Sequence, residues 1–324
     1  MTRVRRKMKR VMIARHKDSP TLAPSIGAEH ICVCVCTYKR PLPLKRLLAE
    51  LNRQETGGLF TYSIVVADND ETESGKPTVE EMQRLSPVPI RYCVEPRRNI
   101  ALARNKVLEN AEGEYIALID DDEFPQPSWL VTLFKACKEY KVDGVLGPVK
   151  RHFDEVPPAW FAKSRIYDRE VHPTGMVVAW QEARTGNALL NRRIIAEDDA
   201  PFRPEYRAGE DQDFFRRKME EGWVFIWSAD ATVFESIPPA RWKRGFILRK
   251  ALLQGATAAL QPDCDGVNIA KSLVAIPIYA VVLPFTLLLG QRHFMTMLEK
   301  ACHHAGKLLM LAGINPIREE YVSE

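Results

Sequence analysis

Two clusters of acidic residues have the residue types and spacing that could do chemistry. The first, Asp120–Glu123, follows the apolar run 115–119, and the second begins with Glu210 and Asp211. Carboxylates this close repel one another, so the arrangement is costly unless a cation lies between them. A divalent metal is the simplest such cation, because Mg²⁺ and Mn²⁺ sites combine one or two carboxylates with substrate phosphates. The pattern therefore indicates a metal-dependent enzyme that acts on a phosphorylated substrate.

Within the first cluster, Asp120 and Asp122 are two positions apart. In an extended chain they project to the same side, where both can reach one cation. We predict that they bind Mg²⁺ or Mn²⁺, which would neutralise charge on a leaving diphosphate. A solvated acidic turn is the alternative. In the second cluster, Asp211 could be a general base that takes a proton from an attacking hydroxyl, or the acids could only stabilise the start of a helix.

The acids need a scaffold that brings them together, and the chain predicts one from residue 31 onward. Short apolar runs, expected as strands, alternate with helical patterns, and two late strands are expected at 223–228 and 232–234. The early strands are expected at 31–36, 62–67, 90–94, 115–119 and 142–146, with helices at 41–52, at 99–110 capped by Asn99, and after Ser128 as a cap. This alternation is typical of an α/β fold with a mostly parallel sheet and helices on both faces.

Polar residues follow three of these strands, at 37–40, 68–70 and 120–122. Ligands of such sheets bind outside the carboxyl ends of the strands, so we expect the three groups to face one crevice. The turn after the first strand has no glycine, and the chain has neither a G-x-G-x-x-G nor a G-x-x-x-x-G-K-[ST] motif. This weighs against a dinucleotide-binding dehydrogenase and against the P-loop enzymes.

The charge of the chain is uneven. The net charge is +4, yet residues 1–17 contain eight Lys or Arg and no acid, which leaves about −4 for the rest. Such a basic tail can bind an anionic membrane surface or nucleic acid, or it can be a solvated leader. The apolar run 11–14 within it is too short for a signal peptide.

The seven cysteines do not form a disulfide pattern. Their number is odd, and Cys32, Cys34 and Cys36 alternate along one expected strand, where their side chains share a face. We expect small buried strand residues in a reducing cytosol.

The C-terminal region carries a long uncharged stretch, 273–290. It approaches the ~20 residues that cross a bilayer. Pro277 and Pro284 interrupt a straight helix. A kinked span, a re-entrant hairpin, an interfacial helix and a buried core helix all remain open.

Taken together, these segments resemble the inverting glycosyltransferases of family 2. The resemblance covers about residues 30–245 and rests on the order of segments 35–41, 66–70, 99–105, 113–123, 185–189 and 209–214. The Asp68–Asp70 turn, the Asp120–Glu123 run and the turn 146–149 look most like the glucosyltransferases that build succinoglycan-type bacterial exopolysaccharide. The resemblance implies the α/β GT-A fold, Rossmann-like, to which we add a C-terminal membrane-associated helical region.

The resemblance also implies roles for individual residues. Asp120 and Asp122 match the family's D-x-D motif, with Asp122 as the foremost metal ligand, and Asp211 matches the catalytic base of the E-D pair. The acceptor hydroxyl would attack the anomeric carbon opposite the leaving UDP, which inverts the configuration. The expected donor-binding residues are Thr37, Tyr38, Arg40, Asp68, Asn69, Arg104, Asn105, Asp120 and Asp121. The expected acceptor-side residues are Thr185, Gly186, Asn187, Glu210, Arg241 and Trp242.

Two departures from the family pattern refine the expectation. Asn69 stands where many members carry an acid, which weakens the inference of uracil as the base. The Q-x-x-R-W motif of processive members keeps only Arg241 and Trp242, so we expect a non-processive enzyme. The acceptor would be a glycan or a lipid-linked oligosaccharide. More Lys and Arg precede Leu273 than follow Gly290, which predicts a catalytic domain on the cytoplasmic face of the inner (plasma) membrane.

The expected organisation is a basic tail at 1–29, a catalytic domain at 30–237 and a C-terminal region at 238–324 with the candidate membrane segment 273–290. The expected partners are a nucleotide-sugar donor, the acceptor and a membrane, and not a nucleic acid. Two alternatives are kept. A sugar nucleotidyltransferase should show a Gly-rich loop after the first strand, which 37–40 lacks. A non-catalytic component of a polysaccharide assembly would be favoured by loss of an acid, yet all are present.

Overall fold

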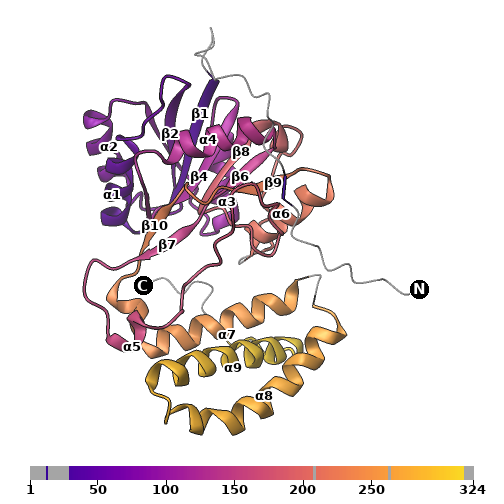
Figure 1. Cartoon of the computed structure of the whole chain (residues 1–324). Helices are drawn as coiled ribbons and strands as arrows, with labels where there is room; N and C mark the ends of the chain where they lie inside the picture. The colour runs from indigo at the N-terminus through magenta and orange to yellow at the C-terminus, as the bar shows by residue number, and fades with distance from the viewer. Residues whose placement is uncertain (1–11, 14–28, 207–208, 262–263, 317–324) are drawn as a thin grey trace. The chain divides into compact units, whose positions relative to one another are not determined.

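The computed structural model describes residues 12–13, 29–206, 209–261 and 264–316. These residues form two compact units (Figure 1). The first unit consists of the described residues up to Lys150 together with Arg169–Glu235. The second consists of Arg151–Asp168 and the described residues from Ser236 onward. The basic tail predicted at 1–29 lies almost entirely outside the described residues.

A seven-stranded sheet organises the first unit, in the order β3-β2-β1-β4-β8-β6-β9. Its strands are β1 (Glu29–Thr37), β2 (Phe60–Asp68), β3 (Ile90–Val94), β4 (Tyr115–Asp120), β6 (Gly144–Leu146), β8 (Asn187–Asn191) and β9 (Phe225–Trp227). All described pairs are parallel except those of β8, which runs antiparallel to β4 and β6. The mostly parallel sheet is confirmed. The antiparallel β8 was not expected from the sequence.

Helices cover both faces of this sheet, as the sequence predicts. The helices are α1 (Pro41–Leu51), α2 (Lys76–Leu85), α3 (Ile100–Glu109), α4 (Trp129–Tyr140) and α6 (Glu210–Glu220). Alternate residues of β1 separate the two cores: Val33 packs with α1, α2 and α4, whereas Cys32 and Cys34 pack with α3 and α6. All seven cysteines are free, and the prediction of Cys32 and Cys34 as buried strand residues is confirmed.

The two predicted helix caps have different outcomes. The side chain of Asn99 accepts hydrogen bonds from the amides of Ala101 and Leu102, which satisfies the start of α3. Ser128 occupies the N-cap position of α4, but its side chain makes no capping bond. Its φ of −86° and ψ of 5° are not the extended values that aim a hydroxyl at the first turn, so that cap prediction is wrong.

A second sheet of three strands has the order β5-β10-β7. Its strands are β5 (Glu123–Pro125), β10 (Val233–Ser236) and β7 (Val149–His152). β10 runs antiparallel to β5, and this register sets Glu235 opposite Glu123. β5 was missed because three residues after an acidic run show no recognisable period.

The second unit is helical, with α5 (Ala159–Ala162), the 3₁₀ helix η2 (Pro239–Trp242), α7 (Arg244–Leu260), α8 (Gly266–Thr286) and α9 (Gln291–Leu311). Part of its core joins Phe161 and Ile166 to Ile237, Trp242 and Ile247. The rings of Phe161 and Trp242 lie 6.3 Å apart between centroids. Residues 151–168 therefore pack with the C-terminal helices, which the expected continuous domain 30–237 did not anticipate.

Candidate active site

Strand register brings the three predicted polar groups to one edge of the sheet. Thr37 on β1 pairs with Asp68 on β2, and Cys36 on β1 pairs with Asp120 on β4. On the other side of β4, Ile119 pairs with Asn187 of β8. Four neighbouring strands thus carry polar residues at the same level, which is the convergence that the sequence predicts.

Asp121 ties the end of β4 to the turn after β1. Thr37 Oγ1 donates to Asp121 Oδ2 at 2.7 Å, and Arg40 Nη1 donates to Asp121 Oδ1 at 3.1 Å. Burial raises the pKa of Asp121 to about 6, and the charge of Arg40 opposes this rise. Because both carboxylate oxygens are engaged with the protein, the geometry favours a positioning role for Asp121 over the contact with the donor that the sequence predicts.

Asp120 and Asp122 flank this buried carboxylate and differ from it in exposure. The side chain of Asp120 is 43% exposed, and that of Asp122 is 14% exposed. Arg40 Nη1 lies 3.2 Å from Asp122 Oδ2. Surrounding protein raises the pKa of Asp120, Arg104 lowers it, and the charge of Asp122 raises it further, although solvent still reaches the carboxylate. Two carboxylates that disfavour each other's ionisation offer hard oxygen ligands only, which fits Mg²⁺ or Mn²⁺.

Arg104 connects the two acidic clusters. From α3, its Nη1 donates to Glu210 Oε1 at the start of α6, and its Nη2 lies 3.5 Å from Asp120 Oδ1. The guanidinium is buried and lies over the ring of Phe202, 5.6 Å from its centroid. Asp211 follows Glu210 directly, and its charge raises the pKa of Asp120. The predicted metal ligands and the predicted base therefore belong to one site.

The carboxylate of Asp211 is held without a short ion pair. Its Oδ1 accepts from the amide of Gln212 at 2.7 Å, and its Oδ2 lies 3.9 Å from Arg184 Nε. Gly209, at φ 83°, occupies the left-handed region just before α6, where glycine is unstrained. This turn sets the helix start, and Asp211 keeps an oxygen that can accept a proton from a substrate hydroxyl.

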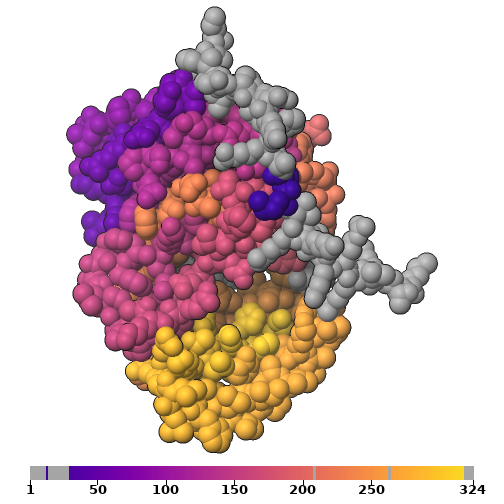
Figure 2. Space-filling model, in the orientation of Figure 1, coloured from indigo at the N-terminus to yellow at the C-terminus, as the bar shows by residue number. Residues whose placement is uncertain are grey.

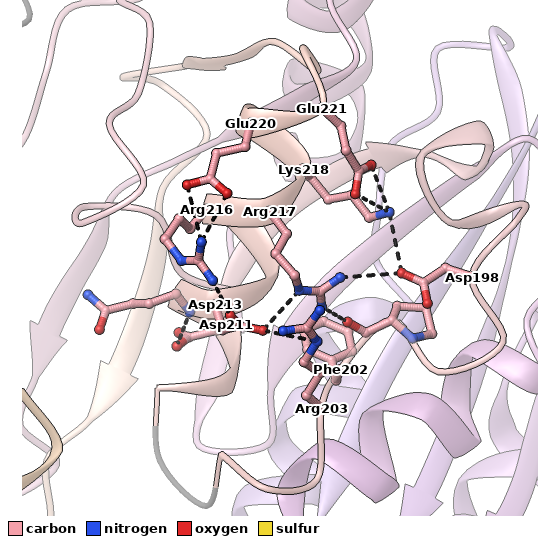
Figure 3. A network of polar contacts seen from close by, with 12 residues as sticks. Asp198, Phe202, Arg203, Asp211, Asp213, Arg216, Arg217, Lys218, Glu220 and Glu221 are labelled. Carbon is pink, nitrogen blue, oxygen red and sulfur yellow. Dashed lines mark hydrogen bonds and ion pairs between the residues drawn. The ribbon is translucent and has the colours of Figure 1, made fainter. Parts of the chain in front are cut away.

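The third acid of this helix, Asp213, has a structural role (Figure 3). Its side chain is 1% exposed, and its oxygens accept from Arg216 Nη2 at 2.7 Å and Arg217 Nε at 2.9 Å. Arg217 also donates to the carbonyl of Pro201 and lies 3.5 Å from Asp198. The network therefore ties the segment before α6 to the helix that carries Asp211.

Asn105 completes this anchor. Its Nδ2 donates to the carbonyl of Phe202 at 2.7 Å, and its Oδ1 accepts from the Phe202 amide at 2.9 Å. The ring of Phe202 stacks on Phe214 of α6 at 4.7 Å. The sequence assigns Asn105 to the donor, but the structure uses its amide to hold this backbone, so we regard it as a positioning residue.

The turn after β2 is also internally bonded. Asn69 Nδ2 donates to the carbonyls of Glu95 and Arg97, and Asn69 Oδ1 accepts from the amide of Asn99. Asp68 is fully buried, and its Oδ2 accepts from the Gly75 amide and the Tyr92 hydroxyl. Burial raises the pKa of Asp68, and these two hydrogen bonds oppose the rise. In this conformation the predicted base-binding pair stabilises the turn itself.

Tyr38 lies beside this turn, half-buried, with Arg98 stacked at 4.8 Å from its ring centroid. Together with Thr37 and Arg40 it remains at the strand ends, in the place that the sequence predicts for donor contacts.

The predicted acceptor-side segment 185–187 is tightly packed. A Cβ on Gly186 would lie 2.6 Å from Glu123 Oε1 and 3.1 Å from Asp120 Oδ2, so a larger residue here would displace these carboxylates. Thr185 is buried. Asn187 accepts from Trp129 Nε1 and donates to the carbonyls of Pro148 and Ala231. Gly186 thus lies directly against Asp120, one of the predicted metal ligands, whereas Asn187 holds the surrounding backbone.

Of the other predicted acceptor residues, Glu210 is paired with Arg104, whereas Arg241 and Trp242 belong to the second unit. Both are buried, and Trp242 Nε1 donates to the carbonyl of Ile237. Trp242 therefore serves the core of that unit.

Two arginines near the acids, Arg169 and Arg184, were missed by the sequence analysis, and Glu123 was recognised in the first acidic cluster but given no role. Arg169 Nη2 lies 3.1 Å from Glu235 Oε2, and its charge lowers the pKa of Asp120. Burial holds the pKa of Glu123 well above its usual range, and the charge of Asp120 raises it further. Arg169 and Arg184 lie in an irregular segment that shows no helical or strand periodicity. Their charge is therefore the only signal in the sequence that could have indicated them.

A comparison with protein families identifies the family of this chain. Residues 32–196 match the model of glycosyl transferase family 2. The chain belongs to this family. It is therefore a glycosyltransferase, and its fold is GT-A.

Individual relatives agree with this assignment. The succinoglycan biosynthesis protein ExoM of Rhizobium meliloti (strain 1021) is 34% identical over 235 residues, which cover 70% of this chain and 74% of ExoM. The hyaluronan synthase of Pasteurella multocida is 25% identical over 189 residues, 53% of this chain and 18% of that enzyme. Among solved structures, the mannosyltransferase PcManGT from Pyrobaculum calidifontis, in complex with GDP-Man and Mn²⁺, has a TM-score of 0.57 at 18% identity and covers 90% of both chains. That likeness concerns the fold.

Proposed function

We propose that this family 2 enzyme transfers one hexose from a nucleotide sugar, with a UDP-sugar as the expected donor, to a hydroxyl of a glycan or lipid-linked oligosaccharide. The similarity to ExoM supports bacterial exopolysaccharide synthesis as the setting. One structural observation carries the proposal: Arg104 contacts both Asp120 and Glu210, which brings the acids after β4 and the start of α6 into one site.

In the proposed reaction, an oxygen of Asp211 accepts the proton of the acceptor hydroxyl. The acceptor oxygen forms a bond to the anomeric carbon as the bond from that carbon to the nucleoside diphosphate breaks. Attack from the face opposite the leaving group inverts the configuration. Arg184, 3.9 Å from Asp211, orients the carboxylate, and Arg104 keeps α6 beside the donor residues.

Asp120 and Asp122 would hold the Mg²⁺ or Mn²⁺. The bound metal supplies neutralising charge for the departing diphosphate. Asp121 fixes the end of β4 through Thr37 and Arg40, and this holds the backbone that carries its two neighbours in place. Gly186 allows the chain of the acceptor side to lie against these carboxylates.

We further propose that the enzyme works at the cytoplasmic face of the plasma membrane, where nucleotide sugars are available and a lipid-linked acceptor can be reached. The apolar helix α8, whose only charged residue is Lys271, supports this, since it is long and apolar enough to cross a membrane by length and composition.

The decisive experiment measures nucleoside diphosphate release from a panel of nucleotide sugars with Mn²⁺, in the presence and absence of a membrane lipid extract. Asp211→Asn should abolish transfer while leaving donor binding, measured by calorimetry, nearly intact. Asp122→Ala should weaken the metal-dependent part of donor binding. Glu220→Gln on the exposed side of the same helix is the matched control and should retain activity. Wild-type turnover by Asp211→Asn would remove it as the base.

A further inference from the structure

The helix α8 has its polarity reversed relative to a helix of a water-soluble protein. Its two buried residues are Ser272 and Thr286, both hydroxyl-bearing. Ser272 Oγ lies 3.0 Å from His304 Nδ1 of α9, and Thr286 Oγ1 donates to the carbonyl of Leu283. The exposed side is instead made of large apolar residues: Leu273, Val274, Ile278, Val281 and Phe285, continued by Leu287, Leu288 and Leu289.

This exposed face is too large and continuous to be explained by scattered surface residues. Leu288 is 85% exposed, and no charged residue lies between Lys271 and Arg292. Contiguous apolar surface of this kind marks contact with a membrane or a partner. The surrounding charge distinguishes these, because residues 239–316 contain nine Lys or Arg against three Asp or Glu, a net of +6. A strongly cationic unit with an apolar face complements an anionic bilayer surface.

The packing of α8 also tells how it meets the bilayer. Four residues, 287–290, join α8 to α9, and Ser272 near the start of α8 contacts His304 near the end of α9. The two helices therefore run antiparallel (Figure 1). With 21 residues α8 is about 32 Å long, enough to cross a hydrocarbon core.

A crossing, however, would carry its neighbour into the hydrocarbon. Glu299 and Lys300 lie near the middle of α9, and each charge at the bilayer centre costs at least about 2.5–3.5 kcal/mol. α7 would follow, because a Cβ at Gly255 or Gly306 would overlap the backbone of the other helix. Lys250 of α7 would then also lie in the hydrocarbon. An interfacial position avoids all of these costs.

We infer that α8 lies in the plane of an anionic lipid bilayer, with Leu273, Ile278, Val281, Phe285 and Leu288 inserted and the side packed on α9 turned away from the bilayer. The inference rests on the proposed membrane-associated function and makes it specific: the protein lies on the membrane and does not span it. Interfacial helices of this type insert about 5–10 Å.

The test uses the full chain and vesicles of phosphatidylethanolamine and phosphatidylglycerol. Wild-type protein should float with these vesicles, float at least tenfold less with neutral phosphatidylcholine vesicles, and be released by alkaline carbonate. The double variant Val281→Glu, Phe285→Glu should lose flotation at least tenfold. Leu288→Glu, just after the helix, provides a second variant with little effect on folding, and circular dichroism melts verify that both variants are folded. Leu42→Glu on the exposed side of α1 is the matched control and should float normally.

Each contrary result is informative. Resistance to carbonate would show a span and overturn the inference. A dimer in lipid-free solution without flotation would show that a second copy covers the apolar face. Normal flotation of both variants would also reject the inference that α8 binds the bilayer. Donor hydrolysis measured without vesicles reports the proposed chemistry separately, so a failure of membrane binding and a failure of the transferase function are distinguishable.

Discussion

Arg104 and Glu210 form a buried ion pair that joins α3 to the first residue of α6. The same guanidinium reaches Asp120, so one cation lies between the acids after β4 and the acids that open α6. Its charge opposes the repulsion between these carboxylates, which would otherwise raise one another's pKa. The pair thus joins α3 to α6 and holds the proposed metal-binding acids beside the proposed base.

Breaking this pair should be costly on either side. Arg104→Met leaves Glu210 buried without its partner, and Glu210→Gln does the reverse, so each should lower the free energy of unfolding by about 3–5 kcal/mol. The double variant should lose less than the sum of the two, which urea unfolding in a double-mutant cycle measures. The exposed pair of Arg91 and Glu112 is the control, where Arg91→Met should change stability by less than about 1 kcal/mol. Additive losses for the buried pair would contradict the coupling.

The positions of these residues were largely readable from the sequence, whereas their roles were less so. Polar residues after consecutive parallel strands must meet at one edge, so the neighbourhood of Asp68 and Asp120 followed from the order of elements. The amides of Asn69, Asn105 and Asn187 lie where a ligand contact was expected. Each is instead bonded to backbone groups of distant segments. Such long-range partners leave no mark on local spacing.

Asp68 should give the protein a distinctive pH dependence. Its pKa is raised mainly by burial, so the folded state keeps a proton that the unfolded chain releases. Stability from this group is therefore greatest below the ordinary pKa of about 3.9 and is lost as the pH rises through the folded pKa. Asp68→Asn should flatten the fall in the free energy of unfolding above about pH 4, measured by urea titration at several pH values.

Asp70, two residues later, provides a control of opposite sign. Burial would raise its pKa, but hydrogen bonds from the hydroxyl and amide of Thr72 and the charge of Lys39 lower it overall. Its stabilising effect is present above the ordinary pKa and is lost as the pH falls through the lowered pKa. Asp70→Asn should therefore remove stability that wild-type protein gains on going from acid to neutral pH. A similar pH profile for both variants would refute the assignment for Asp68.

The contact between α7 and α9 should depend on two glycines. A Cβ at Gly255 would lie 1.9 Å from the carbonyl oxygen of His303, and one at Gly306 would lie 2.1 Å from that of Leu252. Because these neighbours are backbone atoms of the other helix, the helices would have to separate. Gly255→Ala and Gly306→Ala should each lower stability by at least about 1–3 kcal/mol, measured by thermal unfolding.

Gly245 on α7 is the matched control, since a Cβ there meets nothing within 4 Å. Gly245→Ala should leave stability unchanged or raise it by about 0.5–1 kcal/mol, because alanine restricts the unfolded chain and favours a helix. Equal destabilisation by all three substitutions would argue against close packing of α7 and α9.

The second unit shows why some of the organisation could not be predicted. The uncharged stretch 273–290 was recognised in the sequence, and most of it lies in α8, which ends at Thr286. Which of its sides is buried depends on α9, and the inward Ser272 and Thr286 can be recognised only once the two helices are seen together. Residues 151–168 join this unit through Phe161 and Ile166, contacts that span many residues of chain and follow no periodic pattern.

Asp213 should matter for both stability and rate, although it is not assigned to chemistry. Asp213 lies two residues after Asp211, and its charge holds Arg216 and Arg217 (Figure 3). Arg217 in turn bonds the carbonyl of Pro201. Asp213→Asn removes this charge. Since the arginines keep their contacts with Glu220 and Asp198, we expect the lower end of the range for a broken buried pair, about 3 kcal/mol. The rate of transfer should fall further than donor affinity, because the start of α6 positions Asp211.

Glu220→Gln, which removes only the exposed partner of Arg216, should cost less than about 1 kcal/mol and leave the rate unchanged. Equal effects of the two substitutions on unfolding and turnover would show that the buried carboxylate does not hold this helix in place.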